Sequence, residues 1–485
     1  MHRALATQTS HRARLLPVLR ASLPALLLAL PLGVSSAGPQ SRAFVVTTDY
    51  STGSFSAVNL GTRAVAKDVA GVWSDATLRW YNGKVYVVNR AGQDNIQVID
   101  PAAAYATVFQ FSTGSGSNPQ DIAFASPTRA YVSRYDMQAL LVCNPQTGAT
   151  LDTISLAAFA DADHLPEMAH LALIGNHLFV AVQRLDRLNN YVPTAYSLVV
   201  VIDTEADTVL DVDPITPGRQ AITLVARDPV TAFSYVPESH RLLIGCAGRF
   251  LQNDGGIEAI DTQALQSVGL ISTEAQLGGD IGDVEWYSPT HSYAIVSDAS
   301  FDAHLVSFDP STGVKLGTVR SPGGFSLPDC AINDRGELYV ADNGFTTAGL
   351  YVYQAGTDAL IAGPLDTGLP PNQIAFDGAR SEVAGVSDAP VGAAGFEFAA
   401  PWPNPARDRI TFALRLPASA AVQVEVFDLA GRRVATLADG VRPAGESNFT
   451  WRPADAAGRR FDPGIYLVRA RIGSLERVRR LVTIR

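Results

Sequence analysis

The sequence predicts an all-β chain, with a seven-bladed β-propeller followed by a small immunoglobulin-like β-sandwich. Three observations predict this fold class. An apolar strand that ends in Asn or Asp recurs along the chain at intervals of 41 to 59 residues. Short strands with little helical periodicity surround each copy, and repeats of about 40 to 50 residues with four strands are typical of propellers. The composition then shifts near residue 395, which marks a domain boundary.

The composition is that of a folded chain with two or three domains. Its 485 residues are 47% hydrophobic and 17% charged, which excludes a mainly disordered chain, a collagen and a coiled coil. The formal charge of −10 argues against a nucleic-acid partner, because binding to phosphates needs clustered Lys and Arg. Three scattered Cys are too few for a disulfide framework.

Residues 1–37 are predicted to be a secretory signal peptide. Four Arg precede the apolar stretch Ala21–Leu32, and Ser35-Ser36-Ala37 then supplies a small-residue cleavage pattern. A retained membrane anchor is the alternative. No later run reaches the roughly 20 apolar residues of a spanning helix, so we expect an exported mature chain without a transmembrane segment.

The repeated strand occurs seven times. Its Asn or Asp side chain can accept a hydrogen bond from the backbone two residues on, which fixes the turn into the next strand. The copies end at Val58-Asn59, Ile99-Asp100, Cys143-Asn144, Ile202-Asp203, Ile260-Asp261, Phe308-Asp309 and, departing from the pattern, Tyr353-Gln354.

The phase of the repeats predicts a closed ring over residues 38–377. The first copy lacks the first strand of the unit, and the last complete unit is followed by Asn372–Phe376, which matches a first strand with nothing after it. We expect this orphan strand to pair with the N-terminal strands, so that the ring closes without an open edge. A β-helix or stacked sandwiches would not require this complementary phase.

Several repeats resemble the YVTN family of β-propellers. The carrying segments are NPQDIAFASPTRAYVSR (118–134), VCNPQTGATLDTISL (142–156) and SFDPSTGVKLGTV (307–319). The resemblance covers about residues 42–377 and concerns the fold more than the function. It implies kinship with a family that includes surface-layer and other extracytoplasmic proteins.

The C-terminal part is predicted to be a linker, 378–400, followed by a basic sandwich, 401–485. From Phe396 onward there are 15 Arg and 9 acidic residues, whereas residues 38–395 carry 18 basic and 38 acidic groups. Turn signals separate short alternating strands, as in a small sandwich. The expected strands are Ile410–Leu416, Val422–Asp428, Val434–Leu437, Ser447–Trp451, Ile465–Ile472 and Arg477–Ile484.

This tail resembles two known families of domain. Its carrying residues are Pro403-Asn404-Pro405, the segment VFDLAGRRV (426–434), Pro463-Gly464-Ile465-Tyr466 and the terminal RLVTIR (480–485). They look like the C-terminal sorting domain of the type IX secretion system and equally like the immunoglobulin-like domain of the flagellar hook-capping protein. The first resemblance implies transport across the outer membrane and attachment to the cell surface by the secretion machinery. A flagellar role fits less well, because a signal peptide and a propeller precede the domain.

Charged residues at corresponding positions predict a ligand site at the mouth of the channel. Four consecutive repeats carry Arg just after the second strand and the next three carry Asp, and acidic residues also recur near the starts of first strands. A cationic arc facing an anionic one would suit a zwitterionic or peptidic ligand, whereas solvated turns and local ion pairs are the alternative. The candidates are Arg90, Arg134, Arg184, Arg249, Asp49, Asp298, Asp342, Asp121 and Asp283.

No cofactor is predicted, although Ca²⁺ is possible. The densest group of metal-ligand types lies in one loop, and one further carboxylate lies on a predicted inner strand; an acidic loop that is simply solvated is the alternative. These weaker candidates are Asp161, Asp163, His164, Glu167 and Glu285.

The leading functional hypothesis is a non-enzymatic, monomeric binding protein of the cell surface or the medium. The propeller would bind an unidentified ligand or protein, and the C-terminal domain would serve sorting. One alternative is a propeller hydrolase or lactonase that uses channel carboxylates and possibly Ca²⁺. Another is a structural envelope protein. The fold discriminates little among them, because propellers have many functions.

Overall fold

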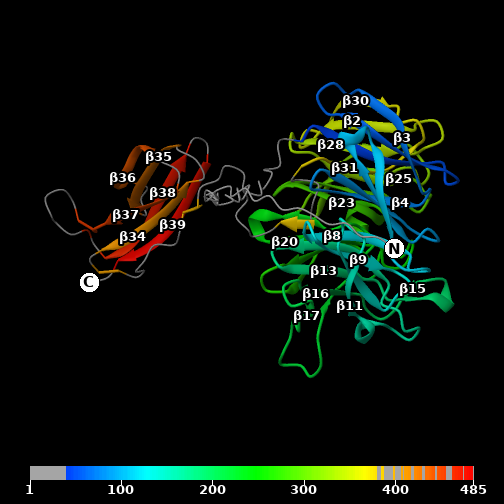
Figure 1. Cartoon of the computed structure of the whole chain (residues 1–485), viewed down its shortest axis with the longest axis horizontal. Coiled ribbons are helices and arrows are strands. Elements are labelled where there is room, and N and C mark those ends of the chain that lie inside the picture. The colour runs from blue at the N-terminus through cyan, green and yellow to red at the C-terminus, as the bar shows by residue number, and fades with distance from the viewer. Residues whose placement is uncertain are drawn as a thin grey trace, which may run out of the picture. The chain divides into compact units, whose positions relative to one another are not determined.

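The computed structural model describes residues 40–378, 384–386, 397–398, 406–407, 409–416, 420–428, 432–442, 445–454, 461, 463–472 and 475–483. Nearly all regular structure is β (Figure 1). The α-helix α1 spans Glu274–Leu277, and four 3₁₀ turns span Pro101–Ala103, Ala157–Phe159, Arg187–Asn189 and Pro237–Ser239. Within the described residues, no helix has the length and apolarity that a membrane span requires.

Residues 42–376 form seven sheets of four or more strands and one two-stranded hairpin, and we number the seven larger sheets along the chain from the first complete one. Each contains four strands in sequential antiparallel order, the first of which lines the channel. Sheet 1 consists of β4 (Ala76–Tyr81), β5 (Lys84–Asn89), β6 (Asn95–Asp100) and β7 (Ala106–Ser112). Sheet 2 consists of β8 (Pro119–Ser126), β9 (Arg129–Arg134), β10 (Ala139–Cys143) and β11 (Thr150–Ser155). Sheet 3 contains β12 (Met168–Ile174), β13 (His177–Val182), β16 (Leu198–Asp203) and β17 (Thr208–Val209).

Sheets 4 to 6 follow the same plan. Sheet 4 consists of β19 (Ser234–Val236), β20 (Arg241–Cys246), β21 (Gly256–Asp261) and β22 (Gln266–Thr273). Sheet 5 consists of β23 (Asp280–Ser288), β24 (His291–Ser297), β25 (Ala303–Asp309) and β26 (Val314–Arg320). Sheet 6 consists of β27 (Asp329–Ile332), β28 (Glu337–Asp342), β29 (Gly349–Gln354) and β30 (Ala359–Leu365). Sheet 3 is larger, because β18 (Ile222–Thr223) also pairs with β16, and a hairpin of β14 (Leu185–Asp186) and β15 (Val192–Pro193) is inserted after β13.

Sheet 7 joins the two ends of the propeller, which confirms the predicted closure. It contains β31 (Pro371–Phe376), β1 (Arg42–Thr48), β2 (Gly53–Asn59) and β3 (Val65–Val72). β31 is the orphan strand, and its pairing with β1 places Phe44 opposite Ala375. Asp377 strengthens this junction, because its Oδ1 accepts hydrogen bonds from the backbone N–H groups of Ser41 and Arg42 at 2.6 and 2.7 Å.

The hydrophobic core of the propeller lies between successive sheets. Seven clusters of buried side chains each combine residues from two neighbouring sheets, and the cluster of sheets 7 and 1 completes the ring. For example, Phe44 of β1 stacks on Trp80 of β4, with ring centroids 5.2 Å apart. Apolar residues on both faces of the inner strands thus make each sheet depend on its two neighbours.

The turns define two sides of the ring. We call one of these ends the mouth side. It carries the turns between the second and third strands of each sheet and the loops that lead from each fourth strand to the first strand of the next sheet. These connections meet at one end because the strands alternate in direction. All predicted arginine and aspartate positions that follow second strands belong to this side.

The C-terminal residues fold as a separate small sandwich, as predicted. One sheet has the order β33 (Glu397–Phe398), β34 (Ile410–Leu416), β37 (Gly445–Trp451), and the other β36 (Arg433–Arg442), β35 (Ala420–Asp428), β38 (Gly464–Ile472), β39 (Leu475–Thr483). Phe412, Val424, Trp451 and Val468 belong to its core.

Two short strands lie within the range predicted as linker. β33 pairs with β34 and therefore belongs to the sandwich. The backbone of β32 (Ala384–Val386) pairs in parallel with β12. The short, Ala- and Gly-rich segments around these strands lack a recognisable strand pattern, so the sequence did not indicate them.

Candidate functional site

Aspartates on three inner strands join neighbouring sheets through hydrogen bonds. Asp121, Asp283 and Asp329 each accept a hydrogen bond from a backbone N–H of the next sheet, at 2.9, 2.9 and 2.8 Å. The donors are Leu171, Cys330 and Ile374, in that order. The acidic residues that recur on first strands therefore hold the ring together.

Polar side chains bridge the other four junctions as well. Between sheets 3 and 4, His170 is hydrogen-bonded to the Val230 carbonyl at 3.1 Å. Between sheets 4 and 5, the Ser234 hydroxyl donates to Glu285 at 3.0 Å. Between sheets 7 and 1, Gln373 accepts a hydrogen bond from the Leu78 N–H at 2.8 Å. Between sheets 1 and 2, the Thr77 hydroxyl donates to the Gln120 carbonyl at 3.2 Å.

Arg79 gives Asp121 a different electrostatic environment from the other channel aspartates. Its guanidinium donates to both carboxylate oxygens, at 2.8 and 2.7 Å, and the Asp121 side chain is only 3% exposed. Burial alone would raise the pKa of Asp121, but Arg79 outweighs burial and holds this pKa well below the usual range. Asp121 is therefore a buried, charged and paired group.

The remaining channel carboxylates surround a cavity of about 470 Å³. Its lining includes Asp283, Glu285 and Asp329 together with Trp286 and Tyr287. Burial raises the pKa of Asp283, and burial and the Asp283 charge raise the pKa of Asp329 well above its usual value. Glu285 accepts hydrogen bonds from Ser234 and from the Ile332 N–H. The cavity is thus partly aromatic and rich in carboxyl groups.

The four predicted arginines lie on the mouth side, but three of them have local partners. Arg90 binds Asp75 and Gln120, and Arg184 stacks on the Tyr196 ring at 4.0 Å. Arg134 donates two hydrogen bonds to the Ala139 carbonyl and one to that of Thr113, and burial lowers its pKa. Arg249 is exposed, and no side-chain partner is found for it among the described residues.

The three predicted aspartates after second strands hold turns. Asp49 accepts from the backbone N–H groups of Ser51 and Thr52, and Asp298 from those of Ser300 and Asp302. Asp342 is fully buried, where it bonds Arg320, the Gly344 N–H and the Thr347 hydroxyl. A ligand role for these seven arginine and aspartate positions stays a prediction.

A pocket of about 530 Å³ on the mouth side brings the predicted residues Arg134, Asp163 and His164 together with Asp136, which was not predicted. Arg134 and Asp136 come from the end of β9 and the turn after it, whereas Asp163 and His164 come from the loop between sheets 2 and 3. A guanidinium, an imidazole and carboxylates therefore face one space, which is the arrangement that a ligand with both charges requires.

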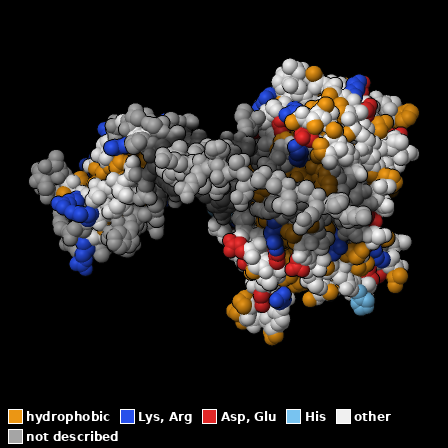
Figure 2. Space-filling view, viewed as in Figure 1, with side chains coloured by type: hydrophobic (Ala, Val, Ile, Leu, Met, Phe, Trp, Pro, Cys, Tyr) orange, Lys and Arg blue, Asp and Glu red, His pale blue; other side chains and the backbone are white. Residues whose placement is uncertain are grey.

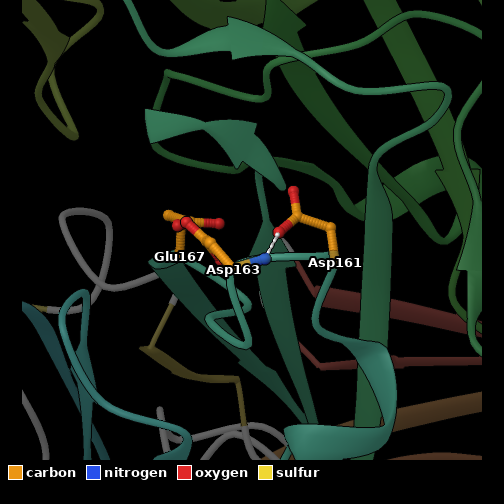
Figure 3. Close-up of side chains that lie close together, drawn as sticks. All are labelled: Asp161, Asp163 and Glu167. Carbon is orange, nitrogen blue, oxygen red and sulfur yellow. Dashed lines mark hydrogen bonds between the residues drawn. The ribbon is translucent and has the colours of Figure 1, made fainter. Parts of the chain in front are cut away.

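The acidic loop beside this pocket forms a compact group. Carboxylate oxygens of Asp161, Asp163 and Glu167 all lie within 4.8 Å of one another (Figure 3). The Asp163 N–H donates to Asp161 at 3.2 Å, and Asp161 Oδ2 and Asp163 Oδ2 are buried without a hydrogen bond. Burial raises the pKa of Asp161 and raises that of Glu167 to about 7.

Arg187 supplies the positive charge of this group. It binds Glu167 at 2.9 Å and Asp136 at 2.6 Å, and it lies 3.5 Å from Asp163. Arg187, which lies between β14 and β15, thus places a guanidinium beside the carboxylates predicted as metal candidates, and a metal role for them stays a prediction. The sequence analysis missed Arg187 because it lies in an insertion that the repeat alignment does not cover.

Two further features escaped the sequence analysis. Arg79 and His170 lie in the channel wall, and only the ring geometry places them beside Asp121, at 2.7 and 3.8 Å. Exposed phenylalanines in mouth-side turns are the second feature. Figure 2 shows acidic, basic and hydrophobic side chains interspersed on the visible face of the propeller.

Comparison with known proteins finds a family match for the C-terminal domain. Residues 405–474 match the FlgD Ig-like domain family, and no curated protein matches the chain. Similar solved structures include a putative 6-phosphogluconolactonase from Bacteroides fragilis, with 15% identity and a TM-score of 0.49 over 70% of this chain and 99% of that one. Hydrazine synthase of Kuenenia stuttgartiensis has 13% identity and a TM-score of 0.45 over 60% and 85%.

These likenesses concern the fold alone, because the identities are low. The strand pairing by itself shows seven four-stranded units joined into a ring between β31 and β1. The chain is therefore a propeller protein with a C-terminal domain similar to the FlgD immunoglobulin-like domain.

Proposed function

We propose that this chain is an exported binding protein of the cell surface, with a seven-bladed propeller of the YVTN type. The mixed-charge pocket of Arg134, Asp136, Asp163 and His164 carries the proposal. It draws on two neighbouring sheets, lies at the mouth of the channel and combines cationic with anionic groups. Its ligand would carry both charges, as an amino acid or a short peptide does.

Screening zwitterionic ligands against the mature protein tests this binding function. Free amino acids and dipeptides form the panel, and calorimetry measures binding. Arg134→Gln should weaken binding by at least about tenfold, since a charged group loses its partner. Arg219→Gln is the control, because this arginine is exposed and does not line the pocket. A panel without any binder, or equal binding by Arg134→Gln, would contradict the proposal.

We also propose that the C-terminal sandwich directs sorting to the surface. Its support is the residue pattern of the tail and its basic composition, which contrasts with the acidic propeller. In the native host, the full chain should be accessible to external protease on intact cells, whereas a chain that ends at residue 395 should accumulate in the periplasm. An identical distribution of the two chains would contradict this role.

The channel cavity favours a hydrolase or lactonase as the second candidate. Asp283 and Asp329 have raised pKa values, and a carboxyl group that titrates nearer to neutrality is suited to acid–base catalysis. Hydrolysis of a lactone and ester panel that disappears in Asp283→Asn would support this candidate. Self-assembly in the absence of any ligand would instead favour a structural envelope protein.

A further inference from the structure

Three half-exposed phenylalanines from separate segments form one cluster on the mouth side. Phe250 lies in the turn between β20 and β21, Phe301 in the turn between β24 and β25, and Phe325 in the loop between β26 and β27. Their ring centroids are 5.7 to 6.3 Å apart. The residues remain 54%, 47% and 58% exposed, respectively, so the rings contact one another without being buried.

Hydrogen bonds from backbone N–H groups to carboxylates hold the three segments in place. Asp254 and Asp280 accept from the backbone N–H groups of Arg249 and Leu251, on either side of Phe250, at 2.6 and 2.8 Å. In sheet 5, Asp302 accepts from the Gly324 N–H at 2.6 Å, which ties the Phe325 loop to the Phe301 turn. The rings are therefore presented by fixed loops.

The backbone at Phe301 is unfavourable for a phenylalanine. Its φ is +66°, in the left-handed region, where a side chain costs about 1 to 2 kcal/mol. The corresponding turn of sheet 1 has the same length and places Gln93 at this position, without a positive φ. The fold thus does not require an aromatic ring at this position, and glycine would fit the turn with less strain.

The aromatic surface continues along the neighbouring turns. Phe345, in the turn between β28 and β29, is fully exposed. Tyr50, in the turn between β1 and β2, is 74% exposed, and its hydroxyl accepts a hydrogen bond from Asn343 at 3.1 Å. We call the five residues Phe250, Phe301, Phe325, Phe345 and Tyr50 the aromatic platform. Clustered exposed apolar groups of this kind are typical of interaction sites.

The charge around the aromatic platform indicates its partner. Segments 247–255, 298–302, 321–328, 343–348 and 49–52, which carry its residues, contain four Asp and a single Arg, and Arg227 from outside these segments pairs with one of the four, Asp254. Such a surface repels phosphates and anionic lipids and attracts Lys and Arg. Phenyl rings supply apolar contact without hydrogen-bonding groups, which suits apolar side chains better than sugar hydroxyls.

We propose that the aromatic platform binds a polypeptide segment in which large apolar side chains are flanked by Lys or Arg. This interaction goes beyond the proposed function, because the platform lies on sheets 4 to 7 and the mixed-charge pocket on sheets 2 and 3. Aromatic anchors commonly dominate such interfaces, and the acidic rim would favour the basic partner over an acidic one.

Binding of synthetic peptides to the mature protein tests this inference. The probes are peptides with a central Trp-Leu-Trp flanked by Arg, and matched peptides flanked by Glu. The Arg-flanked peptide should bind at least tenfold more tightly, and added salt should weaken its binding. Replacing Phe250, Phe301 and Phe325 together by Ser should weaken it at least tenfold again.

A matched variant separates this effect from general loss of surface apolarity. Leu151, Val314 and Leu360 lie on outer strands and are 47%, 53% and 56% exposed. Their joint replacement by Ser should leave peptide binding unchanged, and both variants should retain the native melting temperature. Equal binding of the two peptides, or undiminished binding by the phenylalanine variant, would overturn the inference. A glycan array gives a further test. Binding of a glycan by the native protein that is lost in the phenylalanine variant would also overturn the inference. The amino acid and dipeptide panel tests the other pocket and is unaffected by either result.

Discussion

The ion pair of Arg79 and Asp121 should contribute more to stability than any exposed pair of the propeller. The Arg79 side chain is 13% exposed and that of Asp121 is 3% exposed. Replacement of Arg79 by Leu would leave a buried carboxylate without its counter-ion. Such a loss typically costs about 3 to 5 kcal/mol.

Arg90 provides a matched control within the same sheet. Arg90 and its partner Asp75 have side chains that are 27% and 43% exposed. Exposed pairs contribute about 0 to 1 kcal/mol, so Arg90→Leu should have a small effect. Urea denaturation of the mature protein, followed by far-UV circular dichroism, gives the free energy of unfolding of all three proteins.

The pH dependence supplies a second test of the same pair. In the native protein the pKa of Asp121 is lowered, so its contribution is present above the unfolded pKa and is lost as pH falls through the folded pKa. In Arg79→Leu, burial still raises the pKa of Asp121, and only His170 and backbone N–H groups such as that of Leu171 oppose it, so this variant should lose less stability on acidification than the native protein. Equal destabilisation by Arg79→Leu and Arg90→Leu, or an unchanged pH profile, would refute the reasoning.

Three further predictions concern other charged groups. Burial raises the pKa of Glu274 to about 7, so the free energy of unfolding should fall as pH rises from about 5 to 8. In Glu274→Gln this fall should be smaller by about 2 kcal/mol, as measured by urea titrations at each pH. Asp377→Ala should lower the free energy of unfolding by about 1 to 3 kcal/mol, because the N–H groups of Ser41 and Arg42 lose their acceptor; an unchanged melting curve would contradict this. Arg187 already neutralises Glu167 and Asp136, so millimolar Ca²⁺ should raise the melting temperature of Arg187→Gln and leave the native protein unchanged; a Ca²⁺ response of the native protein would contradict it.

The sequence predicts the architecture of the propeller well, because its units repeat one pattern. Alternating apolar residues and turn-forming Asn and Asp recur in each unit, and the orphan strand at Asn372–Phe376 is recognisable from phase alone. The strand pairing of β1 with β31 confirms it. Irregular insertions were less predictable, since the β14–β15 hairpin has no counterpart in other repeats.

The candidate site was predictable only in part. The sequence locates acidic residues such as Asp121 and Asp283, but it does not reveal that their carboxylates bond the next sheet, since those contacts span 50 and 47 residues. It also finds Asp161, Asp163 and Glu167, which the structure brings together. The Arg187 contact with them depends on how the hairpin folds back, and periodicity carries no information on that.

The aromatic platform was likewise not predicted from the sequence. Phe250, Phe301 and Phe325 lie in short segments rich in polar residues or glycine, and each would be unremarkable alone. Their significance arises because the ring places the three segments side by side. A reading of exposed aromatics in corresponding turns would have found them.

Hydrogen–deuterium exchange of the mature protein, with and without its tightest zwitterionic ligand, tests the proposed binding function most directly. The ligand should slow exchange in segments 134–139 and 161–167, which line and flank the mixed-charge pocket. Slower exchange confined to segments 283–287 and 329–332, around the channel cavity, would contradict it.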